Sequence, residues 1–307
     1  MSEPAFRSGF ACIVGRPNVG KSTLLNAILG TDVAATSDRP QTTRHTIRGV
    51  VSRPDRQVVI VDTPGFHRPK TLLGRRLNDL VRGTWAEVDV IAQCFPADEV
   101  IGAGDRFIGR QISGLAGPVK IALVTKTDKV APARVAEQLV ACVSLAQDVG
   151  LEWTEIVPVS AVTGFNVAEF TEILLGCLPP GPPLYPEGEI TDEPDRVLVA
   201  EFIREAALRR MDDEMPHSIA VVVDEMETRP GRPDSDPLVD ITAVLYVERD
   251  SQKPIVIGPR GAGIKQIGTD ARRRTEALLG SKVFLDLRVK VAKDWQRDPK
   301  QLKRLGF

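Results

Sequence analysis

Eight residues near the N-terminus constrain the fold more than any other part of the chain. They read Gly-Arg-Pro-Asn-Val-Gly-Lys-Ser over 15–22, between the apolar run 10–15 and a segment with helical spacing. Glycines at this spacing let backbone N–H groups surround a phosphate, and the positive end of the following helix attracts the same anion. The pattern predicts a strand, a phosphate-binding loop and a helix in that order. The alternative is a glycine-rich turn that only joins strand to helix.

The first half of the chain alternates between two kinds of segment. Short apolar runs lie at 10–15, 58–61, 88–95, 119–124 and 156–159. Segments with helical spacing lie between most of them, at 72–88, 131–149 and 167–178. This alternation predicts an α/β domain over 1–178, with a mostly parallel sheet covered by helices. We expect 44–51 to add an antiparallel strand at one edge.

A proline-rich segment ends this pattern. Residues 179–195 contain six prolines and cannot continue a helix or a central strand, so they are predicted to be a linker. A smaller α+β domain is expected over 196–307. Its elements are expected to be a helix at 197–211, strands at 218–225 and 240–248, helices within 257–279 and a strand at 283–291.

Composition limits the class of protein. Apolar residues make up 42% and charged residues 26% of the 307 residues, and the formal net charge is −1. These values are typical of soluble globular proteins. No apolar run reaches the roughly 18 residues that span a bilayer, and the N-terminus lacks the apolar core of a signal peptide. We expect a cytoplasmic protein whose four cysteines, which form no C-x-x-C pair, are reduced core residues.

Further motifs lie where the predicted strands end. Within the phosphate loop, Lys21 is expected to reach the β and γ phosphates of a nucleotide, and the Ser22 hydroxyl to bind Mg²⁺. The sequence Asp-Thr-Pro-Gly at 62–65 places a carboxylate beside the metal and a backbone N–H near a γ-phosphate. Asp128, in Thr-Lys-Thr-Asp at 125–128, would accept hydrogen bonds from the guanine edge, which adenine cannot donate. Ser160-Ala161 closes the last strand, where a backbone N–H could meet the guanine O6.

In order and spacing these motifs resemble those of translation-factor-class GTPases, and the whole chain resembles the bacterial Era family. Gln-Thr-Thr-Arg-His at 41–45, Ile-Thr-Asp at 190–192 and the Gly-Pro-Arg-Gly turn at 258–261 carry the resemblance beyond the nucleotide motifs. It implies a P-loop GTPase domain followed by a type II KH domain. It also implies GTP and GDP as nucleotides, Mg²⁺ as cofactor, and binding of the 3′ end of 16S ribosomal RNA during assembly of the 30S subunit.

The motifs and the resemblance together give a set of candidate site residues. Thr43, with Thr42 as the alternative, is expected to bind Mg²⁺ and sense the γ-phosphate, so that the metal ligands are Ser22, Thr43 and Asp62. Lys21, Thr43 and Gly65 are expected to act in hydrolysis, whereas His45 is expected to be a surface residue. The expected nucleotide-binding residues are Gly15, Asn18, Val19, Gly20, Lys21, Ser22, Thr23, Asp62, Thr63, Pro64, Gly65, Thr125, Lys126, Asp128, Ser160 and Ala161.

Two positions depart from related GTPases. Thr125 replaces an asparagine whose amide would bridge the base and the phosphate loop, so nucleotide affinity is expected to be lower. Phe66 follows Gly65 where many signalling GTPases have a glutamine that orients the attacking water, and a phenyl ring cannot do so. Slow intrinsic hydrolysis is therefore expected. Asn18 is either structural or helps to hold a potassium ion that stabilises the transferred phosphate.

The last 57 residues carry a surplus of positive charge. Fourteen basic residues outnumber five acidic ones from 251 to 307, a field that attracts a phosphate backbone. The Gly-x-x-Gly turn from Gly258 to Gly261 lies between helical segments, and such a turn clamps about four unstacked nucleotides. Pro259 stands where family members usually carry a basic residue. The expected RNA-binding residues are Gly258, Pro259, Arg260, Gly261, Lys265, Arg272, Arg273 and Lys290.

Several alternatives stay open at this point. Phe284 and Trp295 are each either base-stacking or core residues. The turn at 258–261 could join two helices without binding a ligand, and the nucleotide site could serve as a structural clamp. A tRNA-modifying GTPase would need a cofactor-binding domain that the chain lacks. We expect a monomer, with peripheral contact to the inner face of the cell membrane through basic residues.

Overall fold

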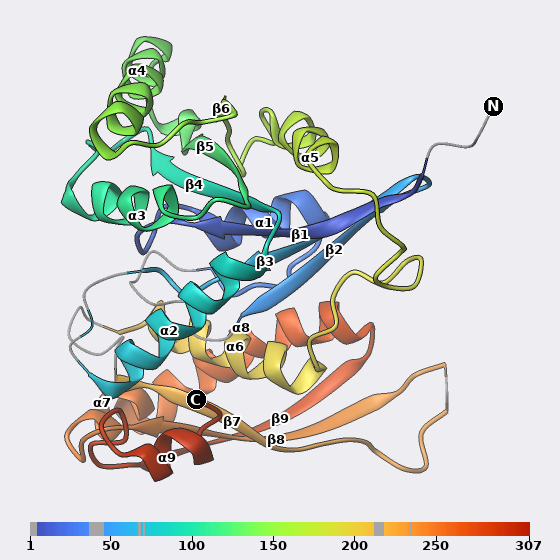
Figure 1. The fold of residues 1–307 in the computed structure, drawn as a ribbon. Helices are drawn as coiled ribbons and strands as arrows, with labels where there is room; N and C mark the ends of the chain where they lie inside the picture. Colours follow the sequence, from blue (N-terminus) through green and yellow to red (C-terminus); the bar gives the residue numbers. More distant parts are fainter. Residues whose placement is uncertain (1–4, 37–45, 67–68, 70, 212–217, 234) are drawn as a thin grey trace. The chain divides into compact units, whose positions relative to one another are not determined.

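The structure is a computed structural model that describes residues 5–36, 46–66, 69, 71–211, 218–233 and 235–307 (Figure 1). Its contacts divide the chain into two compact units. The first unit contains Met1–Ala34, Thr43–Arg68 and Leu77–Asp192, and the second contains Ala35–Thr42, Pro69–Arg76 and Glu193–Phe307.

The first unit is built on a six-stranded sheet with the order β2-β3-β1-β4-β5-β6. Its strands are β1 (Arg7–Val14), β2 (Ile47–Arg53), β3 (Arg56–Asp62), β4 (Val90–Pro96), β5 (Val119–Thr125) and β6 (Glu155–Pro158). All neighbouring pairs are parallel except β2 and β3, which are antiparallel. The predicted α/β class and the antiparallel edge strand are therefore confirmed.

Helices cover both faces of this sheet. They are α1 (Lys21–Leu29), α2 (Leu72–Glu87), α3 (Ala103–Ser113), α4 (Pro132–Val149) and α5 (Val167–Gly176). Side chains of α2 and α3, such as Trp85 and Ile108, pack on Cys12 and Val14 of β1. Helix α4 packs on β4 and β5 through Leu145, and α1 packs against α5. The close packing of apolar side chains holds each helix on its face of the sheet.

Helix α3 is not among the helices that we expected, because its two glycines lower the helix propensity of the segment. The structure gives each glycine a packing role. A Cβ atom at Gly104 would lie 2.7 Å from Cδ of Arg16, and one at Gly109 would lie 3.3 Å from Cδ2 of Leu145. Tertiary packing thus favours small residues at two positions where glycine weakens the local helical signal.

The proline-rich segment hydrogen-bonds to strands of the first unit as far as Asp192. The Ser8 hydroxyl donates to the Pro182 carbonyl oxygen at 2.6 Å, and the buried Gln57 amide donates to the Tyr185 carbonyl oxygen at 3.0 Å. The Val50 N–H donates to the Ile190 carbonyl oxygen at 2.8 Å. The segment is therefore held against strands β1, β3 and β2 of this unit.

The second unit is α+β. It contains α6 (Asp195–Leu208), β7 (Ala220–Thr228), β8 (Leu238–Val247), α7 (Gln252–Ile257), α8 (Ala262–Leu279), β9 (Lys282–Val291) and α9 (Pro299–Arg304). Its strand order is β7-β8-β9, with β7 and β8 antiparallel and β8 and β9 parallel. Helices α6 and α8 pack together and share one core with the sheet, including Ile203, Ile241 and Ala271.

The structure shows how deeply the four cysteines are buried. Cys12, Cys94 and Cys142 are buried, as expected for core thiols, whereas Cys177 is only half-buried. Burial also raises the pKa of the Cys142 thiol to about 12. Within the part of the chain that the structure describes, no helix is long and apolar enough to cross a membrane.

Trp295 is a core residue. Its side chain is fully buried, its Nε1 donates to the Ser218 carbonyl oxygen at 3.2 Å, and its ring stacks on Phe307 at 5.6 Å between centroids. Arg304 lies over the ring of Tyr246 in the same region. The C-terminal segment is thus anchored on the rest of the second unit by this tryptophan.

Trp295→Ala should lower the free energy of unfolding of the second unit by about 3–5 kcal/mol, because it removes a fully buried large side chain. Urea unfolding followed by circular dichroism measures this change. Trp295→Phe should cost less, since it keeps most of the apolar contact. A loss below about 1 kcal/mol in the alanine variant would show that Trp295 does not anchor the segment.

Candidate functional site

The loop between β1 and α1 has the backbone of a phosphate-binding loop. Gly20 has φ 96° and Asn18 has φ 65°. A Cβ atom at Gly15 would lie 2.8 Å from Cγ2 of Val19 and 3.2 Å from the Cys94 carbonyl oxygen, so only glycine fits. Helix α1 begins directly after this turn at Lys21. The N–H groups of its first turn and its positive dipole end favour an anion at the loop.

Lys21 is held inside the loop. Its side chain is buried, and Nζ donates to the carbonyl oxygen of Arg16 at 2.9 Å and to that of Gly15 at 3.4 Å. Burial lowers the pKa of the Lys21 ammonium, and the negative charge of Asp62 opposes this shift. A phosphate beside Nζ would further favour the charged ammonium.

Ser22 and Asp62 lie together, as the motifs predict. The Ser22 hydroxyl at the start of α1 donates to Oδ2 of Asp62 at 2.6 Å, and Asp62 is fully buried at the end of β3. A hydroxyl and a carboxylate are hard oxygen ligands of the kind that Mg²⁺ prefers. The residues present therefore fit a magnesium ion held between this pair and a phosphate.

The segment after Asp62 packs on the phosphate loop. The Thr63 hydroxyl donates to the Ile13 carbonyl oxygen at 3.3 Å, and the Phe66 N–H donates to the Gly15 carbonyl oxygen at 3.3 Å. A Cβ atom at Gly65 would lie 2.9 Å from the backbone nitrogen of Pro17. Gly65 is required here because the two loops approach so closely.

Phe66 is buried among aromatic side chains. Its ring centroid lies 4.9 Å from that of Trp85 and 5.6 Å from that of Phe107, and Arg82 lies over the ring at 5.6 Å. Only 3% of the residue is exposed. Phe66 therefore stabilises the packing of α2 and α3 and offers no polar atom to a water molecule.

The motif at 125–128 is connected to both neighbouring loops. The Thr125 hydroxyl donates to the Val19 carbonyl oxygen at 2.7 Å, so it does reach the phosphate loop. Oδ1 of Asp128 accepts from the buried Ser160 hydroxyl at 2.6 Å, and Lys126 has a left-handed backbone with φ 56°. The structure thus brings the predicted guanine-reading residues to the end of the sheet that carries the phosphate loop.

Two acidic residues that the sequence did not single out support these loops. Arg16 donates to Asp105 at 2.8 Å and to Glu99 at 2.9 Å. Burial lowers the pKa of the Arg16 guanidinium, but the hydrogen bonds and charges of both carboxylates outweigh it and raise the pKa overall. Glu99 also lies 3.7 Å from Nζ of Lys126. In the sequence, the position of Arg16 inside the phosphate loop was the one sign that acidic side chains should pair with it.

The predicted switch residues cannot be placed. Thr42, Thr43 and His45 lie outside the described residues. The choice between Thr42 and Thr43 as magnesium ligand therefore stays a prediction.

The second unit carries the predicted glycine turn. Gly258 has φ 70°, Arg260 has φ 51° and Gly261 has φ 78°, and the turn joins α7 to α8 through Pro259. A Cβ atom at Gly258 would lie 2.8 Å from the backbone nitrogen of Gly263, whereas one at Gly261 would meet nothing within 4 Å. Gly258 is thus needed for close packing, and Gly261 leaves an open approach to the turn.

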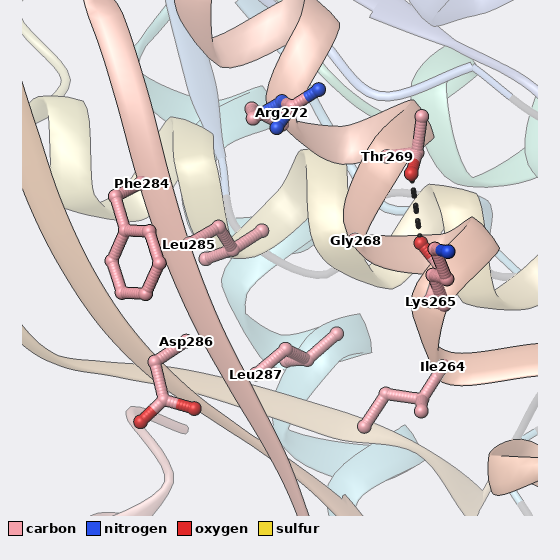
Figure 2. Close-up of a pocket in the computed structure, with 9 residues that line it drawn as sticks. All are labelled: Ile264, Lys265, Gly268, Thr269, Arg272, Phe284, Leu285, Asp286 and Leu287. Carbon is pink, nitrogen blue, oxygen red and sulfur yellow. Dashed lines mark hydrogen bonds between the residues drawn. The ribbon is translucent and has the colours of Figure 1, made fainter. Parts of the chain in front are cut away.

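A groove lies between α8 and β9 (Figure 2). Its volume is about 390 Å³, and it is lined by Ile264, Lys265, Gly268, Thr269, Arg272, Phe284, Leu285, Asp286 and Leu287. Of the predicted RNA-binding residues, Lys265 and Arg272 line the groove. Arg273 and Lys290 are exposed but are not among the lining residues.

Comparisons with known proteins find a family model for part of each unit. A family model described as 50S ribosome-binding GTPase matches residues 10–126, and a KH domain model matches residues 214–296. GTPase Era of Streptomyces coelicolor is 60% identical over 306 residues, which cover 100% of this chain and 96% of that protein. GTPase Era of Mycobacterium avium is 63% identical over 303 residues, which cover 98% and 99%.

Solved structures of Era are also similar. One is a complex of Era with MgGDPNP and nucleotides 1506–1542 of 16S ribosomal RNA, with 38% identity, a TM-score of 0.91, and coverage of 98% of this chain and 99% of that one. An Aquifex aeolicus Era variant bound to GDP and AlF₄⁻ has the same identity, coverage and TM-score. Because full-length relatives reach this identity, the chain belongs to the Era family of GTPases.

Proposed function

We propose that this chain binds GTP and hydrolyses it to GDP and phosphate, and that it binds the 3′ region of 16S ribosomal RNA in assembly of the 30S subunit. The observation that carries the first part is the meeting of the phosphate loop, the Ser22–Asp62 pair and the Asp128–Ser160 pair at one end of one sheet. The groove beside the glycine turn supports the second part.

The phosphates lie against the loop in this proposal. Backbone N–H groups from Asn18 to Thr23 surround the α and β phosphates, and Lys21 donates to the β and γ phosphates in place of its present carbonyl partners. Ser22, Asp62 and Thr43 hold Mg²⁺. The ion neutralises charge that develops on the phosphate oxygens during transfer.

The base is read by a carboxylate that is already oriented. The Ser160 hydroxyl fixes Oδ1 of Asp128. The carboxylate is therefore already in the rotamer that accepts hydrogen bonds from guanine N1–H and N2–H₂. The Ala161 N–H and the stem of Lys126 complete the base site. Thr125 fixes the position of this motif on the phosphate loop through its hydroxyl.

Hydrolysis depends on positioning and charge neutralisation. Phe66 is packed between Trp85 and Phe107, so no side chain at that position orients the attacking water. Lys21, the Gly65 N–H and the Thr43 backbone stabilise the transferred phosphate instead. A potassium ion held by Asn18 would supply the additional positive charge, and the turnover without it is slow.

Asp128→Asn should lower GTP affinity by about 100-fold or more and raise preference for xanthosine triphosphate, because the amide donates to xanthine O2. Oδ1 of the amide can still accept from Ser160, so the loop keeps its support. Competition binding with both nucleotides measures the switch. Asp148→Asn, an exposed acid of α4, is the matched control, and unchanged GTP selectivity in Asp128→Asn would assign base reading to another residue.

Potassium dependence tests Asn18 separately. GTP turnover should be faster in KCl than in NaCl at equal ionic strength, and Asn18→Gly should remove the difference. Glycine is the better substitution than alanine because residue 18 has φ 65°. Equal turnover of the parent in the two salts would leave Asn18 with a structural role.

RNA recognition combines the turn with the groove. The turn lets a phosphate backbone approach closely at Gly261, and Lys265 and Arg272 line the groove where the next nucleotides would lie. Strand β9 is one of the two edge strands of its sheet, so its outer backbone groups can pair with base edges. Arg273 and Lys290 contribute longer-range attraction.

Gly261→Asp should reduce RNA affinity by at least about tenfold, because a carboxylate would face the phosphates that approach the turn. Aspartate tolerates the left-handed backbone at this position, and its side chain has room. Gly261→Asn has the same shape without the charge and should bind more tightly than Gly261→Asp. GTP hydrolysis should persist in both, and an Asp variant that folds and binds RNA like the parent would contradict the KH assignment.

Finer expectations also belong to this proposal. We place the domains at 1–178 and 196–307, with 179–195 as a linker. This linker is hydrogen-bonded to the first unit and belongs to it as far as Asp192. The protein acts as a monomer. The basic residues of the C-terminal segment support a weak peripheral contact with an anionic membrane surface.

A further inference from the structure

Phe284 differs from the other aromatic residues of the second unit. Phe202, Tyr246 and Trp295 are buried and Phe307 is half-buried, whereas 55% of Phe284 is exposed. Among the described residues of this unit it is the one exposed aromatic side chain. The exposed phenyl ring offers a flat apolar face beside the groove, where a ligand could stack on it.

The ring lies just around the edge strand from the RNA groove (Figure 2). Leu285 and Leu287 of β9 point toward α8, while Phe284 and Asp286 point to the other side of the strand. Because successive side chains alternate along a strand, Phe284 lies on the sheet face opposite the helices. An RNA strand that leaves the groove over β9 reaches this ring.

Charged side chains surround the ring. Arg229 lies over the ring with Cζ 5.5 Å from its centroid. Asp240, which is opposite Phe284 in the β8–β9 register, accepts from Arg229 at 2.8 and 2.6 Å. Asp286 accepts from Arg288 at 2.6 Å. Asp240 and Asp286 are each paired with an arginine, and the exposed Glu227 of β7 lies opposite Asp240 in the β7–β8 register. This face therefore suits an uncharged base better than a phosphate.

We propose that Phe284, backed by Arg229, is a stacking platform for one unpaired base that flanks the nucleotides held in the groove. This inference rests on the RNA binding proposed above and extends it beyond the glycine turn. Aromatic side chains bind every base through its π-face, so the platform adds affinity with little sequence preference. It releases no counterions, because it contacts no phosphate.

The salt dependence of RNA binding separates the role of Phe284 from that of the groove cations. Phe284→Leu keeps an apolar side chain but loses the aromatic face, and it should weaken RNA binding by about 5- to 100-fold with an unchanged salt slope. Phe284→Trp should bind as the parent does. Arg272→Ala should weaken binding and reduce the slope of log affinity against log salt by about 0.7, as expected for one lost phosphate contact on a single strand.

The test uses the full chain and a fluorescent single-stranded RNA with the 3′-terminal sequence of 16S ribosomal RNA. Anisotropy titrations at several KCl concentrations compare the parent with Phe284→Leu, Phe284→Trp and Arg272→Ala. The same RNA is then made abasic at one position at a time. At one position, the abasic RNA should bind the parent as weakly as the intact RNA binds the Phe284→Leu variant. The same abasic RNA should bind that variant almost as well as the intact RNA does. Phe165→Leu, an equally exposed phenylalanine of the first unit, is the matched control and should have no effect.

The outcomes distinguish the inference from the function on which it rests. If Gly261→Asp loses binding but Phe284→Leu binds like the parent, the platform is excluded and the KH site stands. A weaker Phe284→Leu that also has a reduced salt slope, or that loses affinity equally for every abasic RNA, would likewise overturn stacking. If Gly261→Asp has no effect, or the parent does not bind this RNA, the proposed RNA function itself fails.

Discussion

Parallel pairing of β1 with β3 on one side and β4 on the other is the constraint on which the nucleotide chemistry depends. Parallel strands end at the same edge of a sheet, so the loops that follow β1, β3 and β5 must converge there. The Ser22 hydroxyl lies 2.6 Å from Oδ2 of Asp62, although the two residues are 40 positions apart in the sequence. Any register error in this sheet would separate the phosphate, metal and base contacts at once.

Hydrogen bonds between loops then fix the geometry that the sheet makes possible. Thr125 binds the backbone of the phosphate loop, Ser160 orients Asp128, and Glu99 and Asp105 fix the side chain of Arg16. Each such hydrogen bond contributes only about 0.5–1.5 kcal/mol to stability. Together they orient the guanine and phosphate contacts before a nucleotide binds, which lowers the entropic cost of binding.

Much of this architecture could be predicted from the sequence, because strong local signals agree with the fold. Strand runs, the glycine-lysine loop and the glycine turn each combine periodicity with a required backbone conformation. Helix α3 was missed because Gly104 and Gly109 serve tertiary packing at the expense of helix propensity. The packing partners of Phe66, the ion pairs of Glu99 and the exposure of Phe284 could not be predicted, since they depend on segments distant in sequence. Trp295 and Phe284 look alike in the sequence, and only their burial separates a core residue from a surface one.

The central claim is that the buried Lys21 belongs to a phosphate site and not to the loop's internal structure. Titration of the chain with a fluorescent GDP analogue tests it most directly, with circular dichroism to show that each variant is folded. Lys21→Ala should bind at least about 100-fold more weakly than the parent, because the phosphates lose a charge-assisted contact in a buried site. Lys129→Ala, an exposed lysine of the same unit, should bind normally. A folded Lys21→Ala variant with the parent's affinity would contradict the account.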